Sequence, residues 1–229
     1  MGWKAGAKSA GISRFALDLT ILVCYRIVVS IQHIDHITYV SAFEDQNDFI
    51  ARWGLLGFKE YVRVHTPRYP AAHIALASGD DPNFPWAMMT GLSVSDDPKS
   101  AINLFIQRYG AGPQHVAYNI GPEEDMEELH RKLVARGWRF MTEVLTYRDS
   151  TGAGIRQMFV APQVPYGPFS ELVQRIPGPS GQPFDGFDTT NIDNLYEAYV
   201  DYSVHLDNRK SAVRAGTANP PGSNILTLG

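Results

Sequence analysis

Three short strand-like segments of this 229-residue chain each contain one side chain that could bind a metal ion. The segments are 34–37 with His36, 114–117 with His115, and 169–175 with Glu171. In each of them apolar or β-branched residues follow the period-two alternation of a strand that faces two different environments. We therefore predict a sheet that carries these three side chains on strands far apart in the sequence and brings them together.

The three residue types form a recognised set of metal ligands. Two imidazoles and one carboxylate make the facial triad that holds non-heme Fe(II) and leaves positions open for substrate and O2. A lone strand histidine is more often a half-buried, hydrogen-bonded residue, and a lone glutamate is often solvated. The prediction of a metal site therefore depends on the three residues occurring together in matching contexts.

Composition and charge exclude several classes of protein. The formal net charge is −4 and the isoelectric point is about 6.0, so there is no electrostatic case for binding nucleic acid or an anionic membrane. The single cysteine, Cys24, excludes an internal disulfide and a cysteine-based zinc site. This cysteine usage fits a reducing compartment, and we expect a cytoplasmic protein.

The two ends of the chain differ from its middle. Residues 1–30 are expected to form an N-terminal extension, in which Asp18 and Arg26 interrupt a partly apolar stretch and argue against a membrane span or a secretory signal. A disordered extension, an added helix, non-native residues from an upstream start and an organelle-targeting segment all stay open. Residues 207–229, rich in Asn, Gly, Pro and Ala, are expected to form a flexible tail.

The interior shows the same order of predicted elements twice. The first set comprises a strand at 34–41, a helix at 44–54, strands at 58–64, 71–78 and 86–93, and a connecting helix at 98–109. The second set comprises a strand at 114–120, a helix that begins at Pro122 and ends at Gly137, and strands at 138–144, 155–160 and 168–175. A last helix is predicted at 190–203, with an apolar stripe that packs on the core or closes a cavity.

This order predicts an α+β fold of two paired βαβββ modules that form a cupped mixed sheet around a metal site. The modules span residues 31–110 and 111–206, the second with a C-terminal lid helix, and together form one catalytic domain over residues 31–206. The first strand of each module supplies a histidine, and the last strand of the second supplies the glutamate.

The motifs resemble those of the vicinal oxygen chelate superfamily, and in particular the C-terminal catalytic half of 4-hydroxyphenylpyruvate dioxygenase and hydroxymandelate synthase. The resemblance extends from about Ile34 to Tyr199, and the family's N-terminal half has no counterpart here. The segments that carry it are Ile-Asp-His-Ile at 34–37, Lys-Ser-Ala-Ile at 99–102, Gly-Ala-Gly-Pro-Gln-His-Val-Ala at 110–117, Gln-Met-Phe at 157–159, Pro-Phe-Ser-Glu-Leu-Val-Gln-Arg at 168–175, and Gly-Phe at 186–187 with Asn191 four residues on.

The resemblance implies that His36, His115 and Glu171 bind Fe(II) and form the catalytic centre. It also implies a set of substrate-binding residues: Gln157, Phe159, Gln114, Asn103, Phe187, Asn191 and Ile192. Ideal alternation places Gln114 on the face opposite His115, so its role requires a local bulge or twist. The chain departs from the family at Ala101, where a glutamine is usual, and at Ile192, where a phenylalanine is usual.

The implied activity is an Fe(II)-dependent dioxygenase that oxidatively decarboxylates a 2-oxo acid similar to 4-hydroxyphenylpyruvate and hydroxylates the same molecule. Its partners would be the 2-oxo acid and O2, without nucleic acid or membrane, and a homo-oligomer stays open. The alternatives are an extradiol catechol dioxygenase with the same triad and a metal-free, drug-sequestering protein.

Asp35 is expected to point away from the metal. The remaining histidines have no assigned role: His33, His65, His73, His130 and His205.

Overall fold

The computed structural model describes residues 31–78, 89–181, 184 and 186–214. The first module consists of β1 (Ile31–Val40), a short 3-10 turn η1 (Phe43–Asp45), α1 (Gln46–Gly54), β2 (Phe58–Thr66), β3 (Ala71–Ser78) and β4 (Met89–Val94). Helix α2 (Ala101–Tyr109) leads to the second module, which consists of β5 (Gly112–Ile120), α3 (Met126–Val134), β6 (Leu145–Arg148), β7 (Gly154–Phe159) and β8 (Phe169–Ile176). Helix α4 (Thr189–Arg214) follows.

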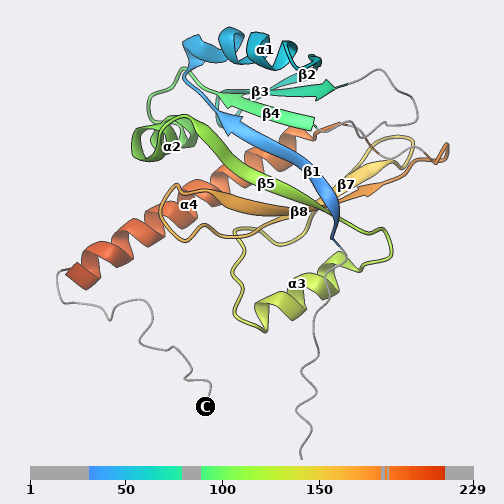
Figure 1. Ribbon diagram of the computed structural model, residues 1–229. Coiled ribbons are helices and arrows are strands. Elements are labelled where there is room, and N and C mark those ends of the chain that lie inside the picture. The colour runs from blue at the N-terminus through green and yellow to red at the C-terminus, as the bar shows by residue number, and fades with distance from the viewer. Residues whose placement is uncertain (1–30, 79–88, 182–183, 185, 215–229) are drawn as a thin grey trace, which may run out of the picture.

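The eight strands of the described residues belong to one curled mixed sheet, in the order β2-β3-β4-β1-β5-β8-β7-β6 (Figure 1). The order is two-fold symmetric, because β1 pairs in parallel with β4, β5 pairs in parallel with β8, and β1 and β5 pair antiparallel at the centre. The predicted α+β fold of two βαβββ modules with a cupped sheet is confirmed.

The helices cover the two faces of the sheet because each has an apolar side to bury. On the outer face, α1 packs Phe49, Ile50 and Trp53 against the first module, and α3 packs Met126, Leu129 and Leu133 against the second. On the inner face, Leu195, Tyr196 and Tyr199 of α4 join a core with α2 and β8. Helix α4 therefore lies within the curve of the sheet (Figure 1).

Helix α3 begins at Met126, so the prediction of a helix start at Pro122 is wrong. Asp125 is the N-cap, with an extended backbone, and its side chain accepts a hydrogen bond of 2.9 Å from the backbone N–H of Glu128. An aspartate in this position satisfies one of the free N–H groups of the first turn. The residues between Pro122 and Asp125 form a turn that precedes the helix.

The strand predicted at 138–144 is also wrong, because this segment makes only one isolated bridge, between Phe140 and Val160. Its place in the sheet is taken by β6, which pairs with β7 through a tight hairpin. The Asp149 carboxylate accepts hydrogen bonds from the backbone N–H (2.8 Å) and the hydroxyl (2.6 Å) of Thr151 in that hairpin. This turn chemistry sets the register of the strands that flank it.

Helix α4 is longer than the sequence predicts and continues to Arg214, so residues 207–214 are helical and do not belong to a flexible tail. Asp207 accepts a hydrogen bond of 2.8 Å from the guanidinium of Arg108, which ties this part of α4 to α2. The predicted extension at 1–30 and the rest of the predicted tail, 215–229, lie outside the described residues.

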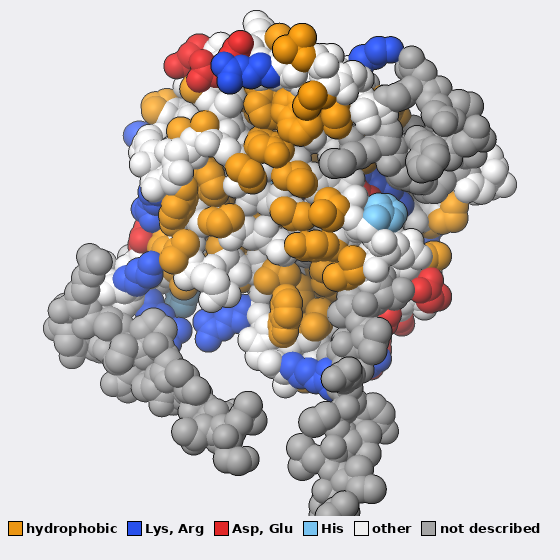
Figure 2. Space-filling model, in the orientation of Figure 1, with side chains coloured by type: hydrophobic (Ala, Val, Ile, Leu, Met, Phe, Trp, Pro, Cys, Tyr) orange, Lys and Arg blue, Asp and Glu red, His pale blue; other side chains and the backbone are white. Residues whose placement is uncertain are grey.

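Hydrophobic side chains gather on the outer face of the sheet between α1 and α3 (Figure 2). Two large hydrophobic side chains of β1 are exposed to solvent: Ile31 (50%) and Ile34 (46%). Within the described part of the chain, no helix is both long and apolar enough to cross a membrane.

We expect the substitution Leu129→Ala in α3 to lower the free energy of unfolding by about 2–5 kcal/mol, because it leaves a cavity in a fully buried position. Val134→Ala on the same helix is the matched control, since Val134 is 47% exposed and its truncation should change stability by less than about 0.5 kcal/mol. Urea unfolding followed by circular dichroism measures both. Equal effects of the two substitutions would contradict the packing of α3 on the sheet.

Candidate metal centre

Strand register places the three predicted ligands side by side. His36 on β1 pairs with Ala117 on β5, and Ala117 in turn pairs with Glu171 on β8, so the three residues lie in one row across the sheet. His115 precedes Ala117 by two residues and lies on the same face of β5. Ala117 is fully buried, and its small side chain leaves space for the longer side chains around it.

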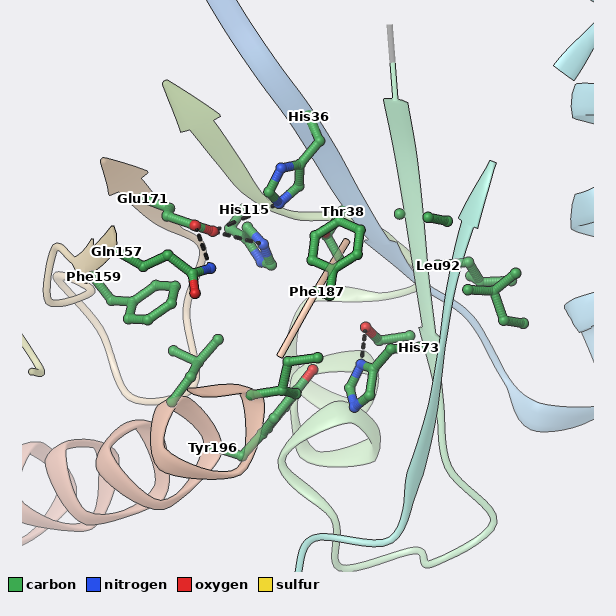
Figure 3. Close-up of a pocket in the computed structure, with 16 residues that line it drawn as sticks. His36, Thr38, His73, Leu92, His115, Gln157, Phe159, Glu171, Phe187 and Tyr196 are labelled. Atoms are coloured by element: carbon green, nitrogen blue, oxygen red, sulfur yellow. Dashed lines mark hydrogen bonds and ion pairs between the residues drawn. The ribbon is translucent and has the colours of Figure 1, made fainter. Parts of the chain in front are cut away.

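The ligand atoms of His36, His115 and Glu171 all lie within 4.8 Å of one another, and the three side chains are buried (Figure 3). The Nε2 atoms of His36 and His115 are each 3.6 Å from the same carboxylate oxygen, Oε2 of Glu171. The other oxygen, Oε1, accepts a hydrogen bond of 2.8 Å from the side-chain amide of Gln157. The structure therefore brings together the triad that the sequence predicts.

A β-bulge precedes each histidine. In the pairing of β1 with β5, Ile34 is opposite Tyr118 and His36 is opposite Ala117, which leaves Asp35 without a partner. The carboxylate of Asp35 can then accept a hydrogen bond of 2.9 Å from Nδ1 of the next residue, His36. In a regular strand these neighbouring side chains would point to opposite faces.

The second bulge is at Gln114, the position where the sequence required one. Thr38 pairs with His115 and Tyr39 pairs with Pro113, so Gln114 is unpaired in the ladder. Its side-chain oxygen lies 3.4 Å from Nδ1 of His115. The two modules thus repeat one arrangement, in which the side chain of the residue before the histidine contacts Nδ1 and orients the imidazole.

Asp35 is held by a buried arginine that the sequence analysis did not assign to the site. Its two oxygens accept hydrogen bonds of 2.7 Å from Nε and Nη2 of Arg175. Burial by itself would raise the pKa of Asp35, but the hydrogen bonds from Arg175 and His36 hold this pKa well below its usual range. The ionised carboxylate can only accept, so in a neutral His36 it favours the tautomer with the proton on Nδ1 and the lone pair on Nε2.

The donor set of the triad fits a divalent cation. Burial lowers the pKa of His115 well below 6.5, so its imidazole is neutral, and the acceptor oxygen of Gln114 near Nδ1 favours a lone pair on Nε2. Two lone pairs then face one oxygen of Glu171, whose pKa is raised by burial. Such a group of buried acceptors is unfavourable by itself, and a metal ion among them would satisfy all three.

A pocket opens beside the triad, with an empty volume of about 540 Å³ that includes space open to solvent. The inner faces of both modules, Phe187 and helix α4 form its walls (Figure 3). Four of the predicted substrate-binding residues line it: Gln157, Phe159, Phe187 and Ile192. The pocket therefore joins the triad to a largely apolar and aromatic space.

Two predicted substrate-binding residues lie behind the pocket wall. Asn191 of α4 donates a hydrogen bond of 2.9 Å to the side-chain oxygen of Gln157, which itself holds Glu171. Gln114 is buried next to His115 and does not line the pocket. Both residues are placed to orient side chains that line the pocket.

Asn103 is not among the residues that line the pocket, so its position does not support its predicted role in binding substrate. Its side-chain nitrogen donates hydrogen bonds to the backbone oxygens of Ser95 (2.9 Å) and Asp97 (2.7 Å), before helix α2. Ala101, two residues earlier, where the family usually has glutamine, is part of the core. The amide of Asn103 therefore serves the loop that leads into α2.

The sequence analysis missed the contribution of the first module to the pocket. His73 of β3 and Ser93 of β4 line it, and Nδ1 of His73 is 2.9 Å from the hydroxyl oxygen of Ser93. Burial lowers the pKa of His73 to about 3, so this imidazole is neutral. Tyr196 of α4 lies 5.3 Å from His73 between ring centroids, and burial raises its pKa to about 12. Strand alternation was the available signal, since His73 and Ala75 share a face.

Similarity to known proteins is found among solved structures. No family model and no curated protein matches the chain. Among solved structures, a triple mutant of 4-hydroxymandelate synthase from Streptomyces coelicolor matches with a TM-score of 0.62 and 21% sequence identity, over 73% of this chain and 54% of that chain. The chain thus corresponds to about half the length of that structure.

Methylmalonyl-CoA epimerases match more weakly. The enzyme from Mycobacterium tuberculosis has a TM-score of 0.49 and 22% identity, over 66% of this chain and 92% of that chain. A variant from Streptomyces coelicolor has a TM-score of 0.48 and 21% identity, over 63% and 95%. The similarity to the synthase establishes a shared fold. The chain has a glyoxalase-type fold, in which two βαβββ modules form one curled mixed sheet.

We expect His115→Ala to abolish tight binding of Fe(II) or Co(II) while the protein stays folded, because the triad loses one of its three ligands. His65→Ala is the control, since it removes an imidazole from an exposed position on β2. Metal content after dialysis and circular dichroism measure the two properties. Unchanged metal content in His115→Ala would contradict the assignment of this residue.

Metal binding should weaken as the pH falls through the range in which the ligands take up protons, because metal and protons compete for the same ligands. Burial raises the pKa of Glu171, so its carboxylate takes up a proton at a higher pH than an exposed glutamate does. Titration with Co(II) at several pH values measures the affinity. An affinity that does not change over this range would contradict the participation of the carboxylate.

Asn103→Ala should lower the free energy of unfolding by about 1–2 kcal/mol, because two hydrogen bonds to backbone oxygens are lost. Its Co(II) affinity should equal that of the unsubstituted protein. Urea unfolding and Co(II) titration test the two statements. A loss of metal binding with unchanged stability would restore Asn103 to the site.

Proposed function

We propose that this protein is an Fe(II)-dependent dioxygenase that oxidatively decarboxylates a 2-oxo acid similar to 4-hydroxyphenylpyruvate and hydroxylates the same molecule. The observation that carries the proposal is the buried set of His36, His115 and Glu171, whose ligand atoms lie within 4.8 Å of one another beside an aromatic pocket. Two histidines and one carboxylate are typical of non-heme iron oxygenases. The shared fold with a 4-hydroxymandelate synthase is consistent with this chemistry.

Bound iron would supply the Lewis acidity and the electrons that activate O2. The protein would position the substrate and exclude water. Phe159 neighbours Glu171 in the strand register and, with Phe187, offers an aromatic wall for a ring close to the triad. Gln157 lines the same space, and its amide is fixed between Glu171 and Asn191. These contacts would hold a substrate next to the metal and keep bulk water out.

An extradiol catechol dioxygenase is the second candidate, because it would use the same three ligands in the same pocket. The two reactions differ in their products, since only the oxidation of a 2-oxo acid releases CO2. A metal-free binding protein is the third candidate. The two Nε2 atoms that face the buried Glu171 carboxylate argue against it, because a binder gains nothing from buried acceptors without a cation.

The test is O2 uptake with parallel capture of CO2 by the Fe(II)-loaded protein supplied with 4-hydroxyphenylpyruvate. We expect O2 consumption with an equal amount of CO2, and product analysis then distinguishes ring from benzylic hydroxylation. The variant His115→Ala, treated with Fe(II) in the same way, is the control for iron in solution.

Other outcomes separate the candidates. O2 uptake with catechols and no CO2 from any 2-oxo acid would favour the ring-cleaving dioxygenase. Tight iron binding without uptake would retain the metal centre and reject 4-hydroxyphenylpyruvate as substrate. A protein that retains no iron would overturn the proposal and favour the metal-free binder.

A further inference from the structure

Arg175 contacts two parts of the molecule that meet at the pocket. On one side its Nε and Nη2 atoms donate to the carboxylate of Asp35, which supports His36. On the other side its Nη1 atom donates to the backbone oxygens of Phe184 (2.8 Å) and Gly186 (3.4 Å). The side chains of Arg175 and Asp35 are only 2% and 1% exposed, so these bonds form away from water.

The backbone held by Arg175 leads directly into Phe187, which lines the pocket. The ring of Phe187 meets the imidazole of His36 edge to face, with 5.5 Å between centroids. The guanidinium carbon of Arg175 lies 5.8 Å from the centroid of the same ring. One cation thus contacts the support of a metal ligand, the backbone before an aromatic wall residue, and the ring itself.

The shape of the guanidinium explains why an arginine is used here. Its planar fork directs several N–H groups at once, so it can bind both carboxylate oxygens of Asp35 and still reach the backbone. A lysine ammonium is a single point of donation and cannot make both sets of contacts. Because Asp35 and Arg175 are buried, neither charge can turn to water when the other moves.

We propose that Arg175 is a positioning residue that links the metal centre to the pocket wall. Metal binding at His36 and the placement of Phe187 then stabilise each other through Asp35 and Arg175. Such coupling is reciprocal by thermodynamic necessity. The inference rests on the metal centre of the proposed function and does not depend on the identity of the substrate.

The first measurement is the affinity of the protein for Co(II), together with the visible absorption spectrum of the bound ion. We expect Arg175→Lys to weaken Co(II) binding by about 10–100-fold, the usual cost of removing the support of a metal ligand, and to change the spectrum. Arg156→Lys is the matched control on the adjacent strand β7, where the arginine contacts Gln174 and Glu127. It should leave both properties unchanged.

The second measurement is hydrogen exchange of the backbone amides of residues 186–188, without metal and with saturating Co(II). Metal should slow exchange in the unsubstituted protein and in Arg156→Lys. It should have little effect in Arg175→Lys, even when the site is filled. The same slowing in Arg175→Lys, or an absence of slowing in the unsubstituted protein, would overturn the coupling.

Should Arg175→Lys fail to fold, Asp35→Asn provides the same test, because it keeps the shape of the side chain and removes the carboxylate charge that Arg175 pairs with. We expect weaker Co(II) binding and loss of the metal effect on residues 186–188. An unsubstituted protein that binds no Co(II) would defeat the metal centre and this inference together. Tight Co(II) binding without any effect on residues 186–188 would defeat the inference alone.

Discussion

The antiparallel pairing of β1 with β5 sets the positions of both candidate histidine ligands. It joins the two modules, and its register sets His36 opposite Ala117 and His115 opposite Thr38. The parallel pairing of β5 with β8 then adds Glu171 to the same row. A shift of one residue in either ladder would move a ligand to the opposite face of the sheet. The helices that pack on both faces oppose such a shift, because each face of the sheet has its own apolar side chains to keep covered.

The bulges in the central pair give the site its chemistry. Without them Asp35 and Gln114 would point away from the imidazoles that they now orient. The two supports are chemically different, since His36 meets an ionised carboxylate and His115 meets a neutral amide. The carboxylate requires a buried cation, and Arg175 provides it. The symmetry of the fold therefore produces two similar ligand positions, and the residues behind them make these positions unequal.

Much of this arrangement follows from local sequence patterns. Alternation of apolar residues predicts the strands that carry the three ligands, and the repeated order of elements predicts two modules and one cupped sheet. Where the prediction fails, a local side-chain interaction outweighs the pattern. Asp125 caps α3, so the helix begins after Pro122, where the sequence predicted its start. The turn at Asp149 joins β6 to β7, so the first strand of this hairpin lies at 145–148 and not at 138–144. Helix α4 continues to Arg214, through a stretch whose composition suggests a tail.

The sequence alone determined the residue types of the candidate ligands and the fold class. The ligand types follow from residue identity. The fold class follows from the alternation of side chains that each strand imposes and from the repeated order of elements. Only the tertiary structure decided how the pocket is built. The side chain of Asn103 in α2 binds the loop before that helix, whereas His73 and Ser93 of the first module line the cavity. The link from Arg175 to Asp35 joins residues 140 positions apart in the chain. Such contacts depend on which strands become neighbours and on where a bulge turns a side chain, and no local pattern specifies either.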